Sequence, residues 1–460
     1  MAARGTSASL DVTQGVICRQ LVSLFVPVLA GAVFQELYTL ANTFIVGRYA
    51  SLEALGAIQA TATLTDLTIS LTMGMGMGCS VIVSQYFGAG DDRRLRQAVH
   101  TAVALALALG VAAAVVGVMG AGPLLRLMGT PQELLAESLD FSYVYFGSAF
   151  LPVLLNMGAA LQRAVGDTRT PARIIALTCL INVGLDMALV AKLDMGARGA
   201  ALATAGSYLV GTVLPYASLM RAKGAWRLHP GQVRINASIA RDMLACALPL
   251  AAQNAVFPLS NMVVQSTVNS FGSETVIAWG LCSRIGSVAW LVSDAFAMAA
   301  TTFSAQNFGA AQYARMRRGM HVSLGMAALG MGLTEALICL FAPDLARLFA
   351  TDATVIDLTA WLVLLTVPFY VIFCFMDVIA GTIRGAGESL RPMAIIVLGT
   401  CVLRIAWMLL AVPRYHSIIT VVVSYPLTWT ITTMMFIVYY RHGRWLTRSL
   451  RTARHRRKDV

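Results

Sequence analysis

QYFGAGDDRRLRQAVH, residues 85–100, returns 221 residues later as QNFGAAQYARMRRGMH, residues 306–321, and this repeat decides the fold. Seven of the sixteen aligned positions are identical. The same offset also aligns single residues elsewhere in the chain: Arg163 with Arg384, Gly166 with Gly387, and Pro171 with Pro392. An internal repeat of this size indicates a duplicated unit. Such a duplication is common in membrane transporters, whose substrate paths run between the two halves.

The composition is that of a membrane protein. Hydrophobic residues make up 58% of the chain and charged residues only 12%, whereas soluble domains carry about 25% charge. Long apolar runs such as 101–122 and 395–412 are long enough for helices that cross the hydrocarbon core. Ten-residue stretches of alternating polarity, typical of a membrane barrel, do not occur. The sequence therefore predicts an all-α integral membrane fold.

Hydropathy predicts twelve transmembrane helices. They lie at residues 16–46, 54–84, 97–121, 138–162, 171–192, 198–220, 238–270, 276–305, 319–342, 356–383, 392–412 and 416–440.

The positive residues set the predicted orientation. Most of the 34 Lys and Arg residues fall on the side of both termini. Only six fall on the other side: Arg48, Arg126, Lys192, Arg198, Arg347 and Arg414. By the positive-inside rule, both termini of this multi-pass protein are expected in the cytoplasm, with the chain in the cell inner membrane. The net charge of +12 therefore indicates topology and contact with anionic lipids, and no nucleic-acid partner is expected.

The longest polar break separates two predicted lobes. An N-terminal six-helix lobe is expected at 1–221, a cytoplasmic linker at 222–237, a C-terminal six-helix lobe at 238–440 and a basic cytoplasmic tail at 441–460. Both copies of the repeated motif are followed by arginines, so both lie on the same face of the membrane. The lobes are therefore expected to be parallel repeats, related by a pseudo-two-fold axis along the membrane normal.

Asp186 is the strongest candidate for a functional charge within a span. Asn182 precedes it by four residues, so the two side chains share one face of a helix. A carboxylate in a poorly hydrated cavity has its proton affinity raised and can alternate between a free state and one that holds a proton or sodium. Alternatively, Asp186 lies near the helix end and meets water there.

Five further acidic residues lie inside predicted spans: Glu36, Asp66, Asp294, Glu335 and Asp377. Each could line a cavity or form a structural ion pair, with Arg284 and Arg404 available as partners. Asp377 aligns with Asn156 by the repeat offset, so both lobes place a polar group at one equivalent depth. Pro27 lies inside the first apolar run, where a proline removes a backbone hydrogen bond and kinks the helix.

The sequence argues against enzymatic chemistry. It holds no nucleophile triad, no metal-ligand cluster and no phosphate-binding loop of the Walker type, so ATP is not the expected energy source. The eight cysteines lie in or beside apolar spans without C-x-x-C spacing. We expect no enzyme activity, no cofactor and no structural metal.

Several segments together resemble the multidrug and toxic compound extrusion (MATE) family, in particular its DinF-related bacterial branch. The resemblance covers nearly the whole chain. The segments that carry it are 36–49, 84–89, 163–167, 181–186, 195–201, 265–272, 306–310 and 384–387.

The resemblance implies a V-shaped pair of six-helix bundles that exports organic cations and related toxic compounds. Export would be driven by inward protons or sodium ions through alternating access. The implied partners are a small-molecule substrate and membrane lipids, and we expect a monomer. Sodium, where it is used, would bind at Asp186.

The resemblance also assigns roles to residues of the N-terminal lobe. The coupling residues would be Asn182, Asp186 and Thr204, the kinking proline would be Pro27, and Gln35 and Tyr38 lie nearby in sequence. The family's first-helix aspartate is replaced by Asn42, which cannot titrate and offers only a neutral oxygen. Glu36 could assist Asp186, but it lies six residues from Asn42 and so points to a different helix face.

Three other functions remain open. A flippase for a lipid-linked saccharide has the same architecture, but its cavity should be lined with cations, and only Arg284 and Arg404 lie in predicted spans. A membrane enzyme would need a nucleophile or metal cluster. A channel is disfavoured by the two-lobed repeat.

Overall fold

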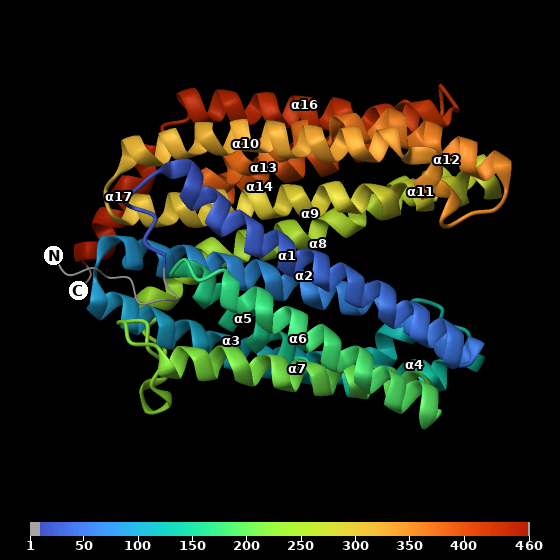
Figure 1. Cartoon of the computed structure of the whole chain (residues 1–460), viewed down its shortest axis with the longest axis horizontal. Coiled ribbons are helices and arrows are strands. Elements are labelled where there is room, and N and C mark those ends of the chain that lie inside the picture. The colour runs from blue at the N-terminus through green and yellow to red at the C-terminus, as the bar shows by residue number, and fades with distance from the viewer. Residues whose placement is uncertain (1–9, 459–460) are drawn as a thin grey trace. The chain divides into compact units, whose positions relative to one another are not determined.

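Helices make up the regular structure of the described residues. The structure is a computed structural model that describes residues 10–458. Within this range every regular element is an α-helix, a 3-10 helix or a π-helix, and no strand occurs (Figure 1). The predicted all-α membrane fold is thereby confirmed. Residues 1–9 and 459–460 lie outside the described residues, and with them the start of the predicted lobe at 1–221 and the end of the predicted tail at 441–460.

Contacts between residues divide the chain into two compact units. Unit 1 comprises Met1–Asp11 and Ala30–Ala251, and unit 2 comprises Val12–Leu29 and Ala252–Val460. Two long helices contribute residues to both units, namely α1 (Ile17–Tyr49) and α8 (Ala237–Val268). The domain boundaries expected from the sequence stay a prediction.

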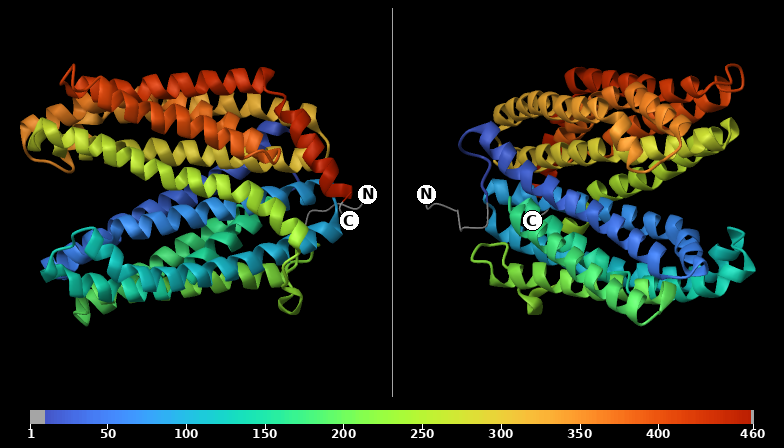
Figure 2. Two further views of the ribbon diagram at one scale, coloured as in Figure 1. Left: turned by 180° about the vertical axis from the view of Figure 1, so that it is seen from behind. Right: turned by 45° about the vertical axis from the view of Figure 1, so that its right-hand side comes forward.

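The helices of unit 1 form one bundle, which the views of Figure 2 show from two further sides. In it α2 packs against α5, α3 against α4 and α5, and α6 against α7. Besides parts of α1 and α8, its elements are α2 (Leu52–Ala89), α3 (Asp92–Leu127), α4 (Gln132–Gly147), α5 (Phe150–Ala164), α6 (Arg169–Asp186), the π-helix η1 (Met187–Lys192), α7 (Gly196–Arg221) and the 3-10 turn η2 (Pro230–Gln232).

The helices of unit 2 surround a core that contains the fully buried side chains of Trp429, Phe436 and Phe303. Here α13 packs against α9 and α16, and α10 packs against α9 and α13. The elements are η3 (Asn269–Phe271), α9 (Ser273–Gly309), α10 (Tyr313–Leu340), α11 (Ala342–Arg347), α12 (Ala353–Thr366), η4 (Val367–Phe369), α13 (Tyr370–Gly385), α14 (Leu390–Ile396), η5 (Val397–Val402), α15 (Leu403–Leu410), α16 (Ile418–His442) and α17 (Trp445–Lys458).

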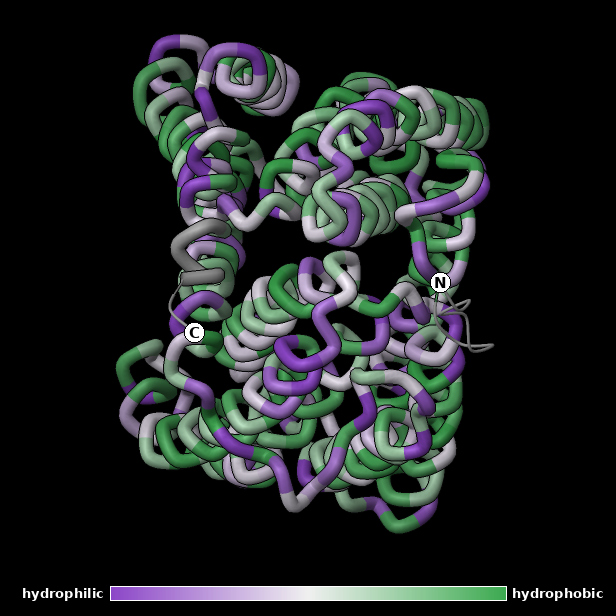
Figure 3. The backbone as a smooth tube through the Cα atoms, turned by 90° about the vertical axis from the view of Figure 1, so that its left-hand side faces the viewer, coloured by the Kyte–Doolittle hydropathy of each residue, from purple (hydrophilic) through white to green (hydrophobic). Residues whose placement is uncertain are grey.

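The number of possible spans agrees with the sequence. Among the described residues, eleven helices are long and apolar enough to cross a membrane, and the number reaches twelve if one bent pair counts as a span. In Figure 3 many of the segments that connect the helices are hydrophilic, while hydrophobic residues prevail along the helices. The chain is therefore an integral membrane protein.

The bent pair replaces the single straight span predicted at 138–162. Helices α4 and α5 meet at an angle of 42°. Pro152 accounts for the break, because it has no amide hydrogen to donate to the carbonyl of Ser148. The Ser148 hydroxyl donates to the carbonyls of Val144 and Tyr145, both at 2.9 Å, which satisfies carbonyls of the last turn of α4.

Two glycines allow α8 to approach α2 closely within unit 1. A Cβ atom on Gly74 would lie 2.5 Å from the backbone of Ala251, and one on Gly78 would lie 2.2 Å from the Cα atom of Ala247. Four residues separate the two glycines, so they face the same side of α2. Only a residue without a side chain fits at these contacts.

Candidate functional site

Asp186 and Asn182 lie at the end of α6, inside unit 1. Both side chains are fully buried, each with 0% exposure. The α-helix ends at Asp186, and the π-helix η1 begins at the next residue. π-helical turns are rare and occur often at functional sites, because the extra residue re-aims the neighbouring side chains. The shared helix face predicted from the four-residue spacing is consistent with the common burial.

Helix α7 supplies the polar neighbours of Asn182. The Asn182 amide nitrogen donates to the Ser207 hydroxyl at 3.3 Å, and that hydroxyl donates to the Thr204 carbonyl at 2.9 Å. Thr204 itself is half-buried. The sequence did not identify Ser207, although it lies three residues after Thr204 and so on the same face of its helix.

Helix α1 closes the cluster from a third side. The Tyr38 hydroxyl interacts with the side chains of Thr204 and Asn42 and with the charge of Asp186. One turn earlier on α1, the Phe34 carbonyl accepts a hydrogen bond from the Cys179 thiol of α6 at 3.5 Å. The structure therefore brings together five of the residues that the family resemblance had implied, from three different helices: Tyr38, Asn42, Asn182, Asp186 and Thr204. Their role in coupling stays a prediction.

A small cavity of about 20 Å³ lies beside this cluster. Its volume is sufficient for one water molecule or a small ion. Polar groups from α1, α6 and α7 line it together with apolar side chains: Gln35, Tyr38, Leu155, Ile175, Thr178, Cys179, Ser207 and Tyr208. Thr178 precedes Asn182 by one helical turn, so the cavity and the buried amide belong to the same face of α6.

Gly211 permits the contact between α6 and α7. A Cβ atom at this position would lie 2.6 Å from the Thr178 hydroxyl oxygen. The close approach keeps α7 near enough for Ser207 to reach Asn182. On α6 itself, Gly184 has open space where a Cβ would lie.

The charge of Asp186 is not compensated by hydrogen bonds. Among the described residues, neither carboxylate oxygen has a hydrogen-bond partner, and the same holds for the Asn182 amide oxygen. A buried ionised carboxylate without a partner costs several kcal/mol, so such a group takes up a proton or a cation. The oxygen-rich surroundings from Asn42, Tyr38, Asn182 and Thr204 suit either a proton or a hard cation such as sodium.

The other residues predicted for the N-terminal lobe lie outside the buried cluster around Asp186. Glu36 is half-buried on α1, and Asn156 is half-buried on α5. Gln35, the exposed residue directly before Glu36, lines the small cavity. Pro27 lies in the half-buried part of α1 that belongs to unit 2, and α1 continues through it. Asp66 is exposed on α2.

Asp377 in unit 2 is held in an ion pair. The Arg384 guanidinium donates to its carboxylate at 2.6 Å, and both residues are at least nine-tenths buried. The sequence had offered Arg284 and Arg404 as partners, but Arg284 is exposed and Arg404 contacts other groups. The seven-residue spacing of Asp377 and Arg384, two helical turns, was the signal that could have identified this pair.

The remaining acids of unit 2 differ from each other. Asp294 is exposed on α9, within electrostatic reach of Asp377 and Arg384. Glu335 is buried on α10, and its carboxylate accepts a hydrogen bond from the Val371 amide at 2.6 Å. That hydrogen bond connects α10 to the start of α13.

Arg404 is buried among aromatic rings. Its guanidinium carbon lies 4.1 Å from the ring centre of Tyr425 and 6.0 Å from that of Trp429. A terminal nitrogen donates to the Thr428 hydroxyl at 3.4 Å. Cation–π contacts of this kind stabilise a desolvated guanidinium by up to about 2 kcal/mol. These contacts stabilise the Arg404 charge within unit 2, although its Nε atom has no hydrogen-bond partner among the described residues.

An aromatic pocket of about 210 Å³ lies next to Arg404 within unit 2. Two tryptophans and two tyrosines form its apolar walls, and amide and hydroxyl groups supply its polar edge. The lining residues are Asn261, Val264, Gln265, Trp279, Cys282, Ser283, Trp290, Thr366, Tyr370 and Tyr425. Edge contacts with Tyr370, Phe373 and Trp429 hold Trp290 in place. Such a pocket suits a flat ring or an organic cation.

Comparison with known families gives two matches along the chain. The sequence model of the MatE family matches residues 27–188 and again residues 249–410. The two matches have the same length and together cover more than half of the chain. This double match agrees with the repeat that relates residues 85–100 to residues 306–321.

Relatives of known name are multidrug resistance proteins and transporters. The probable multidrug resistance protein YoeA of Bacillus subtilis is 26% identical over 439 residues, which is 92% of this chain and 94% of the relative. The FAD transporter of Shewanella oneidensis is 28% identical over 390 residues, 84% of this chain and 85% of the relative.

Solved structures share the fold. An outward-facing multidrug resistance MATE family transporter of the MOP superfamily matches with a TM-score of 0.90 at 21% identity, covering 98% of this chain and all of the other. A MOP superfamily transporter from Pyrococcus furiosus, described as having a binding pocket of reverse polarity, matches with a TM-score of 0.88 at 21% identity, covering 96% and 99%. Together with the double family match, these likenesses identify the chain as a member of the multidrug and toxic compound extrusion (MATE) family of transporters.

Proposed function

We propose that this protein is a secondary active antiporter that exports organic cations and related toxic compounds in exchange for protons or sodium ions. The site that couples ion and substrate movement contains Asp186, with Asn182, Thr204, Tyr38 and Asn42 around it. In the proposed topology the protein acts as a monomer in the cell inner membrane with both termini in the cytoplasm, as the distribution of Lys and Arg favours.

The buried carboxylate of Asp186 is the observation that carries this proposal. It is fully buried, has no hydrogen-bond partner among the described residues, and lies among polar groups of three helices. A purely structural carboxylate would be expected to have a counter-ion or several hydrogen-bond donors. An acid that exchanges its cation must be able to lose it, so permanent partners would oppose its function.

Ion binding at Asp186 can drive transport only if the two access states differ in ion affinity. Loss of the ion leaves an uncompensated buried charge, which favours a state in which water or a cationic substrate reaches the carboxylate. Binding of the ion neutralises the charge and favours the opposite state. Ion and substrate are thereby linked through unit 1, and each lowers the apparent affinity of the other.

The aromatic pocket of unit 2 supports flat, apolar ring systems as part of the substrate. Trp279, Trp290 and Tyr370 offer ring faces and edges to an aromatic cation, while the Tyr425 ring of the same wall already contacts Arg404. Because one relative is an FAD transporter, a flavin nucleotide is a second candidate substrate, ranked below an organic cation because its pyrophosphate is as anionic as that of a lipid-linked saccharide. Its flat ring system would use the same aromatic walls.

A flippase for a lipid-linked saccharide is less well supported. A pyrophosphate group would need several free cationic side chains within the spans, yet Arg384 is paired with Asp377 and Arg404 is stacked on aromatic rings, which leaves Arg284 as the exposed arginine of α9. The buried acid of unit 1 would repel such a substrate.

Transport by proteoliposomes tests the proposal. The vesicles would contain the purified protein and an organic-cation dye, ethidium, with either a pH gradient or a sodium gradient imposed across the membrane. We expect dye movement against its own gradient under one of the two ion gradients. FAD in place of ethidium distinguishes the two candidate substrates. Dye movement that is equal with and without both gradients would contradict antiport.

A further inference from the structure

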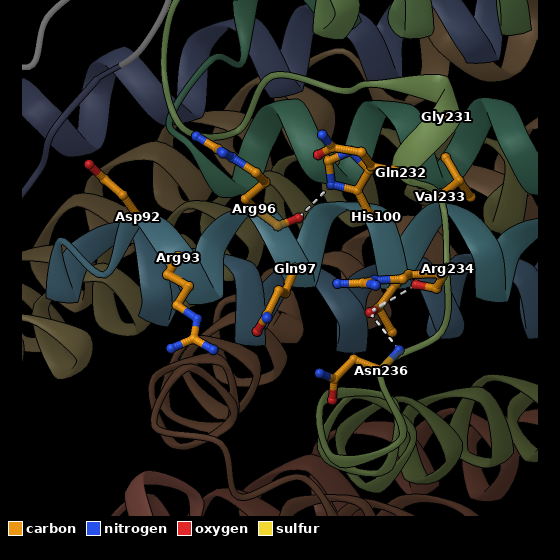
Figure 4. A pocket seen from close by; sticks show the side chains of 11 residues that line it. Asp92, Arg93, Arg96, Gln97, His100, Gly231, Gln232, Val233, Arg234 and Asn236 are labelled. Carbon is orange, nitrogen blue, oxygen red and sulfur yellow. Dashed lines mark hydrogen bonds between the residues drawn. The ribbon is translucent and has the colours of Figure 1, made fainter. Parts of the chain in front are cut away.

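A second cavity in unit 1 lies far along the chain from Asp186 and has a different chemistry. It has a volume of about 650 Å³ and lies between the first turns of α3 and the connector that leads into α8 (Figure 4). Its lining is rich in arginine and amide side chains: Asp92, Arg93, Arg96, Gln97, His100, Thr101, Gly231, Gln232, Val233, Arg234 and Asn236. The proposed transport function does not use this cavity.

Hydrogen bonds hold the connector against α3, so one side of the cavity has a defined structure. The backbone amide of Asn236 donates to the Thr101 hydroxyl oxygen at 3.2 Å, and the backbone amide of His229 donates to the Nε2 atom of His100 at 3.1 Å. Earlier in the connector, the Trp226 ring packs edge-on against Phe87 at 5.5 Å between ring centres. A segment held at several points keeps the polar groups of the cavity in place.

His100 supports this wall as a neutral side chain. Its Nδ1 atom lies 2.7 Å from the Arg96 carbonyl, which can only accept, so Nδ1 carries the proton. Its Nε2 atom accepts from the His229 amide and therefore carries none. Both ring nitrogens are used, so the positive charge of the cavity comes from the arginines.

Three guanidinium groups outnumber one carboxylate in the lining. Arg93, Arg96 and Arg234 are exposed, and no ion pair is recorded for any of them within residues 10–458. Asp92 is the only acid among the lining residues. Figure 4 shows Arg93 and Gln97 pointing from α3 toward the side on which Asn236 lies, with Arg234 beside them.

We propose that this cavity binds a phosphate-bearing anion. A guanidinium group donates two parallel hydrogen bonds to phosphate oxygens, and Arg93 and Arg234 on one side of α3 favour a phosphate ester over a simple halide. The side-chain amides of Gln97, Gln232 and Asn236 add neutral donors. The side-chain oxygen of Asn236 already accepts from the Ile239 amide at the start of α8, so its side-chain nitrogen is the group left for a ligand. The volume exceeds that of one phosphate group and admits its ester substituent.

Two sources supply this chemistry, and each fits the position of the cavity. Positive charge at this end of α3 is expected to face the cytoplasmic leaflet, where anionic lipid headgroups are concentrated. A soluble phosphate ester could enter from the same side. In both cases the ligand connects α3 to the connector and so stabilises the N-terminal end of α8.

Binding of two probes to the purified full-length protein tests the proposal. Dioctanoyl phosphatidylglycerol represents the lipid headgroup, and glycerol 3-phosphate represents the soluble ester. The references without net negative charge are zwitterionic dioctanoyl phosphatidylcholine and uncharged glycerol. Affinity is measured by native mass spectrometry and by the shift in thermal unfolding. We expect at least one anionic probe to bind more tightly than its reference. The double substitution Arg93→Gln/Arg234→Gln should weaken this binding about tenfold, as loss of charge-assisted hydrogen bonds does.

Two further variants make the result specific. Arg48→Gln/Arg126→Gln removes the same charge from exposed arginines at the last turns of α1 and α3 and should leave affinity unchanged. Arg93→Lys/Arg234→Lys keeps the charge and the membrane topology but loses the paired donors, so its affinity should fall by less than that of the Gln variant.

The pattern of binding decides the outcome. Arginine-dependent binding of phosphatidylglycerol alone supports a lipid site, and arginine-dependent binding of glycerol 3-phosphate supports a soluble ligand. The proposal is overturned if neither anion binds more tightly than its reference, or if the cavity variants bind as tightly as the Arg48/Arg126 control. If the Gln variant does not fold, unchanged affinity in the Lys variant overturns it.

Discussion

The two units treat buried charge in opposite ways. In unit 1, Asp186 is fully buried and has no hydrogen-bond partner among the described residues. In unit 2, Asp377 is paired with Arg384 at 2.6 Å, and Arg404 is stacked on Tyr425. Charge that is permanently compensated stabilises a fold, whereas charge that is left open can bind and release an ion.

The repeat shows where the two halves differ. Asp377 and Arg384 of unit 2 align with Asn156 and Arg163 of unit 1, so the acid of the ion pair has a neutral counterpart. Asp186 in turn aligns with Trp407, whose indole donates to the Thr420 carbonyl at 2.9 Å. The ion pair and the open acid therefore occupy different positions of one ancestral unit. We infer that the buried charges of the two halves have separate tasks, ion exchange in unit 1 and structural support in unit 2.

Replacement of Asp186, the buried acid without a hydrogen-bond partner among the described residues, should reduce transport more than any other substitution. The Asp186→Asn variant keeps the size of the side chain but cannot exchange a proton or hold sodium by charge. We expect gradient-driven dye transport to fall by about 100-fold, the upper range of coupling between two sites. Transport is measured in proteoliposomes under the ion gradient that drives the wild type.

A matched control separates this effect from general loss of charge. Asp140→Asn changes an exposed acid on α4 of the same unit and should transport at the wild-type rate. Both variants should elute as folded protein in detergent. Gradient-driven transport at the wild-type rate in Asp186→Asn would contradict ion exchange at Asp186 of unit 1.

Breaking the ion pair of unit 2 should reduce stability more than coupling. Asp377→Asn leaves the Arg384 guanidinium buried without its counter-charge, which costs about 3–5 kcal/mol. The double variant Asp377→Leu/Arg384→Met removes both charges and should be more stable than the single variant. Unfolding in denaturant and transport per folded molecule are measured in parallel. Loss of the ion dependence of transport with unchanged stability would contradict a structural role for the pair.

Separating α6 from α7 should have an intermediate effect. Gly211→Ala places a methyl group 2.6 Å from the Thr178 hydroxyl, so one of the helices must shift, at a cost of about 1–3 kcal/mol. The shift moves Ser207 away from Asn182 and should weaken transport. Gly184→Ala is the matched control, because open space surrounds its Cβ. Equal stability and equal transport in the two variants would show that the close contact is not needed.

A second carboxylate in the cluster should have the smallest effect. Asn42→Asp adds a half-buried acid next to Tyr38. An ion contact that is partly exposed contributes about 1 kcal/mol or less, so sodium affinity should rise by roughly 2- to 5-fold. Sodium-dependent protection against thermal unfolding measures the change. Unchanged sodium affinity would place Asn42 outside the cluster.

Properties that depend on local spacing could be predicted from the sequence. The hydropathy of the chain predicted the all-helical membrane fold, which the structure confirms. The four-residue spacing of Asn182 and Asp186 predicted one helix face, and both side chains are buried. In each case the deciding information lies within a few helical turns, so it can be read along the chain.

Contacts between helices could not be predicted in the same way. The Ser207 hydroxyl that binds Asn182 and the aromatic rings that surround Arg404 come from other helices, and their distances depend on packing. The π-helical turn after Asp186 has no signal in hydropathy, because it changes the hydrogen-bond pattern of the backbone and not the composition. The bend at Ser148 is different, since Pro152 could have indicated it.

Ion release on substrate binding tests the central claim most directly. Purified protein is loaded with protons in weak buffer, or with radioactive sodium, and the ion that leaves is measured when ethidium is added. We predict that ethidium releases one of these ions from wild-type protein and from Asp140→Asn, but not from Asp186→Asn. Equal release from the Asp186→Asn variant would contradict the account, because the open acid of unit 1 would then not be the group that exchanges the ion.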